Sequence, residues 1–131
     1  MKRLALVLTI VLAGCRTIDG PGEPLEFSDG IEYFEEGLFR PLWDELETCS
    51  KLNGNLRSVS FYYVSRETLP TALPGVRTVG MYFPRSNRIF IVSAELHNPK
   101  VIRHEMMHAL LRDNSGHPPQ YFSSAGLCGY V

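Results

Sequence analysis

The sequence lacks features that would place it in several common classes of protein. Its 131 residues carry a net charge of only −1 and include only three cysteines. No two of these have the Cys-x-x-Cys spacing of a redox or zinc-ribbon site. The basic residues between positions 51 and 103 are scattered, which argues against a nucleic-acid groove. With 44% hydrophobic and 21% charged residues, the chain fits one ordinary globular domain, and neither a disordered nor a collagen-like protein.

The N-terminus has the pattern of an export signal. A basic start, Met1-Lys2-Arg3, precedes an apolar run from Leu4 to Leu12. This run is too short to span a membrane. The next residues complete Leu12-Ala13-Gly14-Cys15, which resembles the bacterial lipobox. The resemblance implies cleavage before Cys15, lipidation of that cysteine and a lipid anchor in a bacterial cell envelope. The alternatives are an ordinary signal peptide with an incidental cysteine, or an uncleaved anchor.

Composition then separates a tether from a folded domain. Residues 19–36 hold seven acidic side chains and no basic one, together with two prolines and three glycines. Such a composition is typical of a flexible, hydrated linker. We therefore predict a signal peptide at residues 1–14, an acidic flexible tether at residues 15–30 and one domain at residues 31–131.

The two remaining cysteines predict a disulfide. Lipidation of Cys15 would leave Cys49 and Cys128 as an even pair in an oxidising compartment. A bridge across a loop of that length would remove about 4 kcal/mol of chain entropy from the unfolded state. Two separate buried thiols are the alternative.

Apolar periodicity and turn residues divide the first part of the domain into one helix and three strands. Apolar residues recur at three- and four-residue steps from Tyr33 to Cys49, as on one face of a helix. Val59 to Val64 is a β-branched and aromatic run of strand length. The strands Thr78 to Phe83 and Arg88 to Val92 flank Pro84-Arg85-Ser86-Asn87, which predicts a hairpin.

The clearest predicted helix carries a pair of histidines. Asn98 and Pro99 suit a helix start, and no breaker follows from Lys100 to Arg112. This helix contains His104-Glu105-Met106-Met107-His108, a match to H-E-x-x-H. Because residues four apart share a helix face, both imidazoles can reach one tetrahedral Zn²⁺. Glu105 would lie about 100° around the helix from His104 and about 60° from His108, beside a water at the metal.

On these residues the chain resembles the zincin metallopeptidases, over residues 78–117. Together with the order of the predicted elements, the resemblance indicates an α+β fold with an N-terminal helix, a short sheet of about three strands with a hairpin, and then an active-site helix. It implies that His104 and His108 bind zinc and that Glu105 is the general base. It further implies that Thr78 to Phe83 pairs with an extended peptide. Neither large subfamily matches downstream, because Leu111 and Asn114 replace the metzincin glycine and third ligand, and no later glutamate could serve as a gluzincin ligand.

A third protein ligand must come from the rest of the chain. His117 is the first choice, because Asp113 to Gly116 can turn the chain back toward His108. Asp113 is the second, although a helix continued through it would carry its side chain off the metal face. His97 is a weaker alternative, since a loop histidine near a helix start commonly has no ligand role.

The sequence leaves two functions open. The first is a membrane-anchored zinc metallopeptidase that hydrolyses a peptide or protein substrate and does not bind nucleic acid. Tyr121 could stabilise its oxyanion, although the pairing with Phe122 favours packing. The second is a non-catalytic zinc-binding envelope lipoprotein with a structural or binding role. Glu105 favours the enzyme, because a structural zinc site has no need of a general base.

Overall fold

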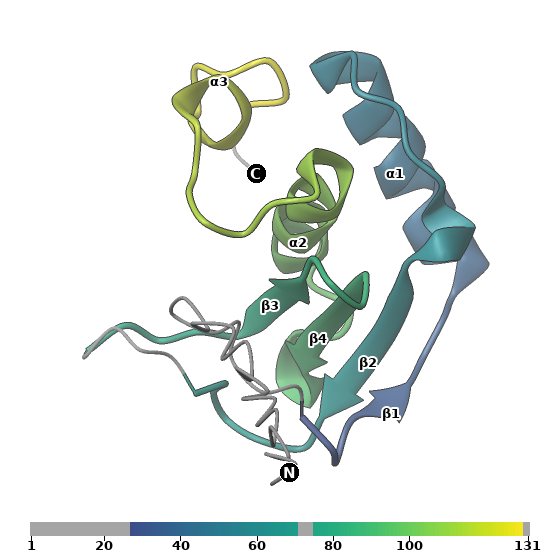
Figure 1. Ribbon diagram of the computed structural model, residues 1–131, viewed down its shortest axis with the longest axis vertical. Helices are drawn as coiled ribbons and strands as arrows, with labels where there is room; N and C mark the ends of the chain where they lie inside the picture. The colour runs from purple at the N-terminus through teal and green to yellow at the C-terminus, as the bar shows by residue number, and fades with distance from the viewer. Residues whose placement is uncertain (1–26, 71–74, 130–131) are drawn as a thin grey trace, which may run out of the picture.

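The computed structural model describes residues 27–70 and 75–129 (Figure 1). The predicted signal peptide, Cys15 and most of the predicted tether lie outside these residues. The elements follow in the order β1 (Ile31–Glu32), α1 (Glu36–Ser50), β2 (Ser60–Val64), β3 (Gly80–Phe83), β4 (Arg88–Val92), α2 (Pro99–Leu111) and α3 (Pro119–Phe122). Short 3-10 turns occur at Leu56–Ser58 and Ser93–Glu95. The fold is α+β, as predicted. Within the described ranges, no helix has the length and apolar character needed to cross a membrane.

One mixed sheet contains the four strands in the order β1-β2-β4-β3. The predicted hairpin is confirmed, because β3 and β4 pair antiparallel with Tyr82 opposite Ile89. β2 pairs parallel with β4, and β1 pairs antiparallel with β2. The sequence pattern predicts three strands, and β1 adds a fourth, because a two-residue strand carries no periodicity and is defined by its partner. This order leaves β3 at one edge of the sheet.

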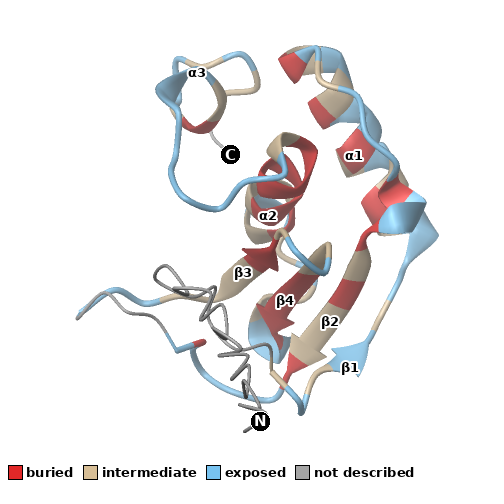
Figure 2. Ribbon diagram, viewed as in Figure 1, coloured by how far each residue is buried: buried red, intermediate tan, exposed pale blue. Residues whose placement is uncertain are grey.

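Two helices cover one face of the sheet. The buried residues of α1 recur at helical spacing, namely Phe39, Trp43, Leu46 and Ser50. α1 begins at Glu36 rather than at Tyr33, because the Tyr33 N–H donates to the carbonyl of Phe61 in β2, 2.8 Å away, and so extends the sheet. α2 packs on β3, β4 and α1. Figure 2 shows the buried residues gathered on α2 and on the parts of α1 and the strands that face it.

The opposite face of the sheet carries a smaller apolar cluster, which includes Phe83, Phe90 and Val92. Phe27 packs edge-on against Phe90, with ring centroids 5.3 Å apart. Asp29 forms a salt bridge of 2.7 Å with Arg66. Phe27 and Asp29 belong to the predicted tether, so the last residues of that stretch contact the folded domain.

The predicted disulfide is confirmed. Cys49 near the end of α1 is bonded to Cys128, which is 79 positions later in the sequence, and their Cα atoms lie 5.1 Å apart. The bond joins the C-terminal residues to α1, so the chain beyond α2 is attached to the core at both of its ends.

Candidate metal centre

α2 begins and ends as its sequence predicts. The Asn98 side chain accepts a hydrogen bond from the Lys100 N–H at 3.1 Å, and Pro99 occupies the first helical position. Arg112 adopts the left-handed conformation with φ 55°, and the Asp113 N–H donates to the His108 carbonyl at 3.1 Å. The helix therefore stops one turn after His108.

The loop after α2 is tied to its surroundings by side chains. The Asp113 carboxylate accepts from the Ser115 N–H at 2.8 Å and from the Ser115 hydroxyl at 2.9 Å. The Asn114 amide donates to the Tyr82 carbonyl of β3 at 2.8 Å. These bonds direct the chain back along α2 and bring His117 beside the two helix histidines.

The structure brings three histidines together. Nε2 of His117 lies 3.0 Å from Nε2 of His104 and 3.2 Å from Nε2 of His108. The three side chains can each offer one ligand atom to a common metal ion. Two nitrogen ligands of a tetrahedral zinc lie about 3.3 Å apart when each bond is about 2.0–2.1 Å. The observed separations therefore fit one ion shared by all three imidazoles.

A backbone bond fixes the tautomer of His108. Its Nδ1 lies 2.8 Å from the Asp113 carbonyl oxygen. Since a carbonyl can only accept, Nδ1 carries the proton and Nε2 keeps its lone pair for a ligand. Burial lowers the pKa of His108 to about 4, even though the bond to the Asp113 carbonyl acts in the opposite direction. His108 is therefore a neutral imidazole over the ordinary pH range, which is the form that can bind a metal ion.

Glu105 lies beside the histidines and faces β3. It is 5% exposed, and a Cβ placed on Gly80 would lie 2.6 Å from its Oε1 atom. Burial raises the pKa of Glu105 to about 8, and a hydrogen bond from the Tyr82 backbone N–H partly offsets this rise. A cation bound nearby would favour the ionised carboxylate. Glu105 is thus a buried carboxylate next to the histidines in sequence, and it is not one of the three residues of the cluster.

The other predicted site residues lie outside this cluster. Asp113 directs its carboxylate to Ser115. His97 precedes α2 and contacts Tyr33 at 3.3 Å and Glu35 at 3.4 Å. Tyr121 is partly buried against the main core, and no hydrogen bond or ring contact among the described residues joins it to the histidines, so its catalytic role stays a prediction.

Phe122 is a residue of the site that sequence reasoning does not single out. Its ring packs against the rings of all three histidines, with centroids 4.6–5.0 Å apart. The sequence does mark Tyr121 and Phe122 as an aromatic pair that favours packing, and Phe122 is buried as this interpretation predicts. The pairing of Phe122 with the histidines depends on where the C-terminal residues fold, which no local pattern shows.

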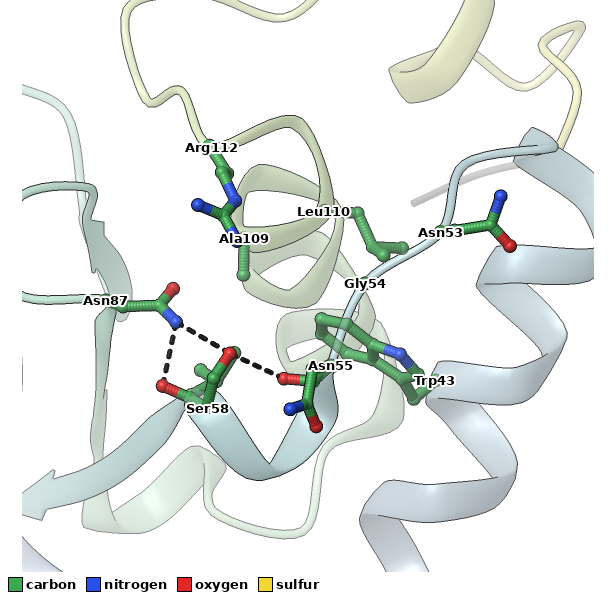
Figure 3. A pocket seen from close by; sticks show the side chains of 10 residues that line it. Trp43, Asn53, Gly54, Asn55, Ser58, Asn87, Ala109, Leu110 and Arg112 are labelled. Carbon is green, nitrogen blue, oxygen red and sulfur yellow. Dashed lines mark hydrogen bonds between the residues drawn. The ribbon is translucent and has the colours of Figure 1, made fainter.

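A separate hollow lies at the C-terminal end of α2, toward α1 (Figure 3). Its wall includes Trp43, Asn55, Asn87 and Arg112, and the Asn87 amide donates to the Ser58 carbonyl at 2.7 Å. Its volume of about 10 Å³ has room for about one water molecule. No histidine lines it, so we assign it no part in the metal chemistry.

Comparison of this chain with protein-family models, with curated proteins and with solved structures finds no match. The residues and the geometry of the site are therefore what point to its function.

Proposed function

We propose that this chain is a zinc-dependent metallopeptidase. The observation that carries the proposal is the convergence of three histidine nitrogens beside Glu105, a buried carboxylate on the same helix. Structural zinc sites commonly close with four protein ligands, whereas catalytic sites keep three protein ligands and an open position. Three histidines with a neighbouring glutamate outside the ligand cluster match the catalytic pattern. Imidazole also binds copper, iron and nickel, so the test must identify which metal the purified protein holds.

The residues of the site divide the chemistry between them. His104, His108 and His117 would hold the ion through their Nε2 atoms. Zn²⁺, when bound, supplies Lewis acidity that polarises a scissile carbonyl and acidifies a water molecule. Glu105 takes the proton of that water on a carboxylate oxygen and passes it to the nitrogen of the leaving amine. The burial that raises its pKa also makes the ionised carboxylate a stronger base, and the Tyr82 N–H orients it.

The substrate is proposed to be an extended peptide that pairs with the edge strand β3, as in the zincins. The register of β3 with β4, together with the bond from the Val92 N–H to the Val79 carbonyl, turns the backbone groups of Gly80 and Tyr82 away from β4. The Tyr82 carbonyl already accepts from Asn114, and the Thr78 carbonyl accepts from the Leu69 N–H at 2.7 Å. A peptide would therefore pair with β3 at Gly80, beside Glu105.

The domain is proposed to act at a bacterial cell envelope, attached through an acylated Cys15. Two observations support this location. The first fifteen residues follow the order of a lipoprotein signal. The Cys49–Cys128 disulfide suits an oxidising compartment.

The decisive experiment changes Glu105→Gln. Glutamine keeps the size of the side chain, and its amide oxygen can still accept from the Tyr82 N–H. We expect the variant to fold and to retain about one zinc per chain, while hydrolysis of a peptide library falls by about 10²-fold or more. Metal content, circular dichroism and peptide cleavage measure these three properties, with His104→Ala as the variant that loses metal.

Two results would contradict the enzyme. Cleavage by wild type that is unchanged in Glu105→Gln would exclude Glu105 as the base. Zinc-loaded wild type that hydrolyses no peptide or envelope substrate would favour the non-catalytic zinc-binding lipoprotein.

A further inference from the structure

Phe122 covers one side of the histidine cluster. Its ring centroid lies 5.0 Å from that of His104, 4.6 Å from that of His108 and 4.8 Å from that of His117. The three histidine centroids are 4.9–5.0 Å from one another. Four rings at nearly equal separations form a tetrahedron, so Phe122 closes one face of the triangle made by the imidazoles. Among the described residues, Phe122 is therefore the aromatic side chain that packs against all three imidazoles.

The three histidines differ in how their rings are held. The Asp113 carbonyl orients His108 through Nδ1. His117 lies on an exposed loop, and among the described residues its hydrogen-bond and ring contacts are with the two helix histidines and Phe122. A metal ligand is ordinarily oriented by a second group behind it, and loss of that group commonly lowers metal affinity by about 10–100-fold. Packing on Phe122 supplies this support for His117.

Phe122 is itself held by the C-terminal segment, which we define as residues 119–129. The segment is closed by a bond from the Leu127 N–H to the Gln120 carbonyl at 2.8 Å. Its far end is attached to α1 by the Cys49–Cys128 disulfide and to α2 by a bond from Arg103 to the Cys128 carbonyl at 3.1 Å. Figure 1 shows the segment running from α3 toward α1, on the side of α2 away from the sheet.

We propose that Phe122 is a positioning residue that orients the imidazoles for metal binding, and that the Cys49–Cys128 disulfide holds it in place. The metal affinity of the site then depends on a covalent bond between α1 and the C-terminal segment. The proposal rests on the proposed metal-binding function, but it concerns only what sets the affinity of that site.

The first test compares Phe122→Ala and Phe122→Leu with wild type. Phe122→Ala removes the packing surface, so zinc affinity should fall by about 10–100-fold, whereas Phe122→Leu, which keeps an apolar side chain, should lose less. Competition with a chromophoric chelator gives the dissociation constants. The visible spectrum of the Co²⁺-substituted protein reports the geometry of the site, and it should change in Phe122→Ala. Leu127→Ala is the matched control, because Leu127 lies on the same segment and is 58% exposed.

The second test removes the disulfide with Cys49→Ala/Cys128→Ala. We expect zinc affinity to fall in the same direction as in Phe122→Ala, and Phe122→Ala added to this double variant should lower it little further, because both changes remove the same support. Circular dichroism without metal establishes that the variants compared are folded. If the disulfide variant does not fold, the two Phe122 variants decide the proposal.

The outcomes separate this inference from the proposed function. Wild type that binds no metal would remove both. Wild type that binds zinc, with the same affinity and the same Co²⁺ spectrum in Phe122→Ala, would overturn the role of Phe122 and leave the metallopeptidase standing. A variant that loses thermal stability but keeps its zinc affinity would show that Phe122 supports only the fold.

Discussion

The carboxylate of Glu105 occupies the space that a side chain at Gly80 would fill. A Cβ at position 80 would lie 2.6 Å from Oε1 and 2.8 Å from Cγ of Glu105. The two residues belong to α2 and to the edge strand β3, so the missing side chain lets the helix carry a carboxylate directly against the strand. The same approach lets the Tyr82 N–H reach Glu105. Gly80 therefore determines where the proposed base lies.

Gly80→Ala should displace Glu105. The added methyl group meets the middle of the side chain as well as its end, so Glu105 cannot avoid it by a small rotation. We expect a loss of about 1–3 kcal/mol in the free energy of unfolding and a large fall in hydrolysis, with zinc affinity changed much less. Gly37→Ala is the control, because no atom lies within 4 Å of its added Cβ and alanine favours the helix there. Full hydrolytic activity in Gly80→Ala would show that Gly80 does not determine the position of Glu105.

Metal-free protein should lose stability as the pH rises from about 6.5 to 8. In this window Glu105, whose pKa burial raises to about 8, still holds its proton in the folded state, whereas an unfolded glutamate with a pKa of 4.5 does not. The folded state binds more protons, so the free energy of unfolding falls with pH, by about 1–2 kcal/mol over the window. Below pH 6.5 the lowered pKa of His108, about 4, makes the free energy of unfolding rise with pH, because the unfolded histidine binds a proton more readily than the folded one.

Urea unfolding of the chelator-treated protein measures this dependence, and Glu105→Gln isolates its source. In Glu105→Gln the free energy of unfolding should not fall between pH 6.5 and 8. The difference in stability between wild type and this variant should therefore narrow or reverse as the pH rises. If the stability of wild type and of Glu105→Gln depended on pH in the same way, Glu105 would not be the source of the pH dependence.

His117 and not Asp113 should supply the third ligand. His117→Ala removes one of the three converging nitrogens, so zinc affinity should fall steeply and the ion should be lost on dialysis. Asp113→Ala removes only the bonds to Ser115 and leaves the backbone carbonyl that orients His108, so zinc should stay bound with a modest loss of affinity. Metal analysis after dialysis distinguishes the two variants. The reverse order of losses would exclude His117 as the third ligand.

Cys15 should carry lipid in the mature protein. The motif Leu12-Ala13-Gly14-Cys15 places the cleavage site directly before this cysteine, so mass spectrometry of the membrane fraction should find Cys15 as an acylated N-terminus. Cys15→Ala should leave the protein unprocessed or release it from the lipid-anchored form. A wild-type product cleaved elsewhere and recovered without lipid would reject the anchor.

The sequence by itself determined the local features of this protein. Asn98, Pro99 and an unbroken run of residues were enough to predict α2, because caps and breakers act within one turn of a helix. The spacing of His104 and His108 fixes their common face for the same reason. The β3–β4 hairpin follows from two strands and a four-residue turn in which Asn87 accepts a positive φ of 57°. The α+β fold class follows from the order of these elements.

Only the tertiary structure decided how distant parts of the chain complete the site. The sequence left His117, Asp113 and His97 as alternatives for the third ligand, and His117 lies at the cluster because the loop before it is bonded to β3 through the Asn114 amide and the Tyr82 carbonyl. The contact between Gly80 and Glu105 joins a strand to a helix and has no periodic signal. Phe122 contacts the histidines from a segment that a disulfide joins to α1, between cysteines 79 positions apart in sequence. Such contacts depend on packing between elements far apart in sequence, which hydrophobic periodicity and turn residues do not encode.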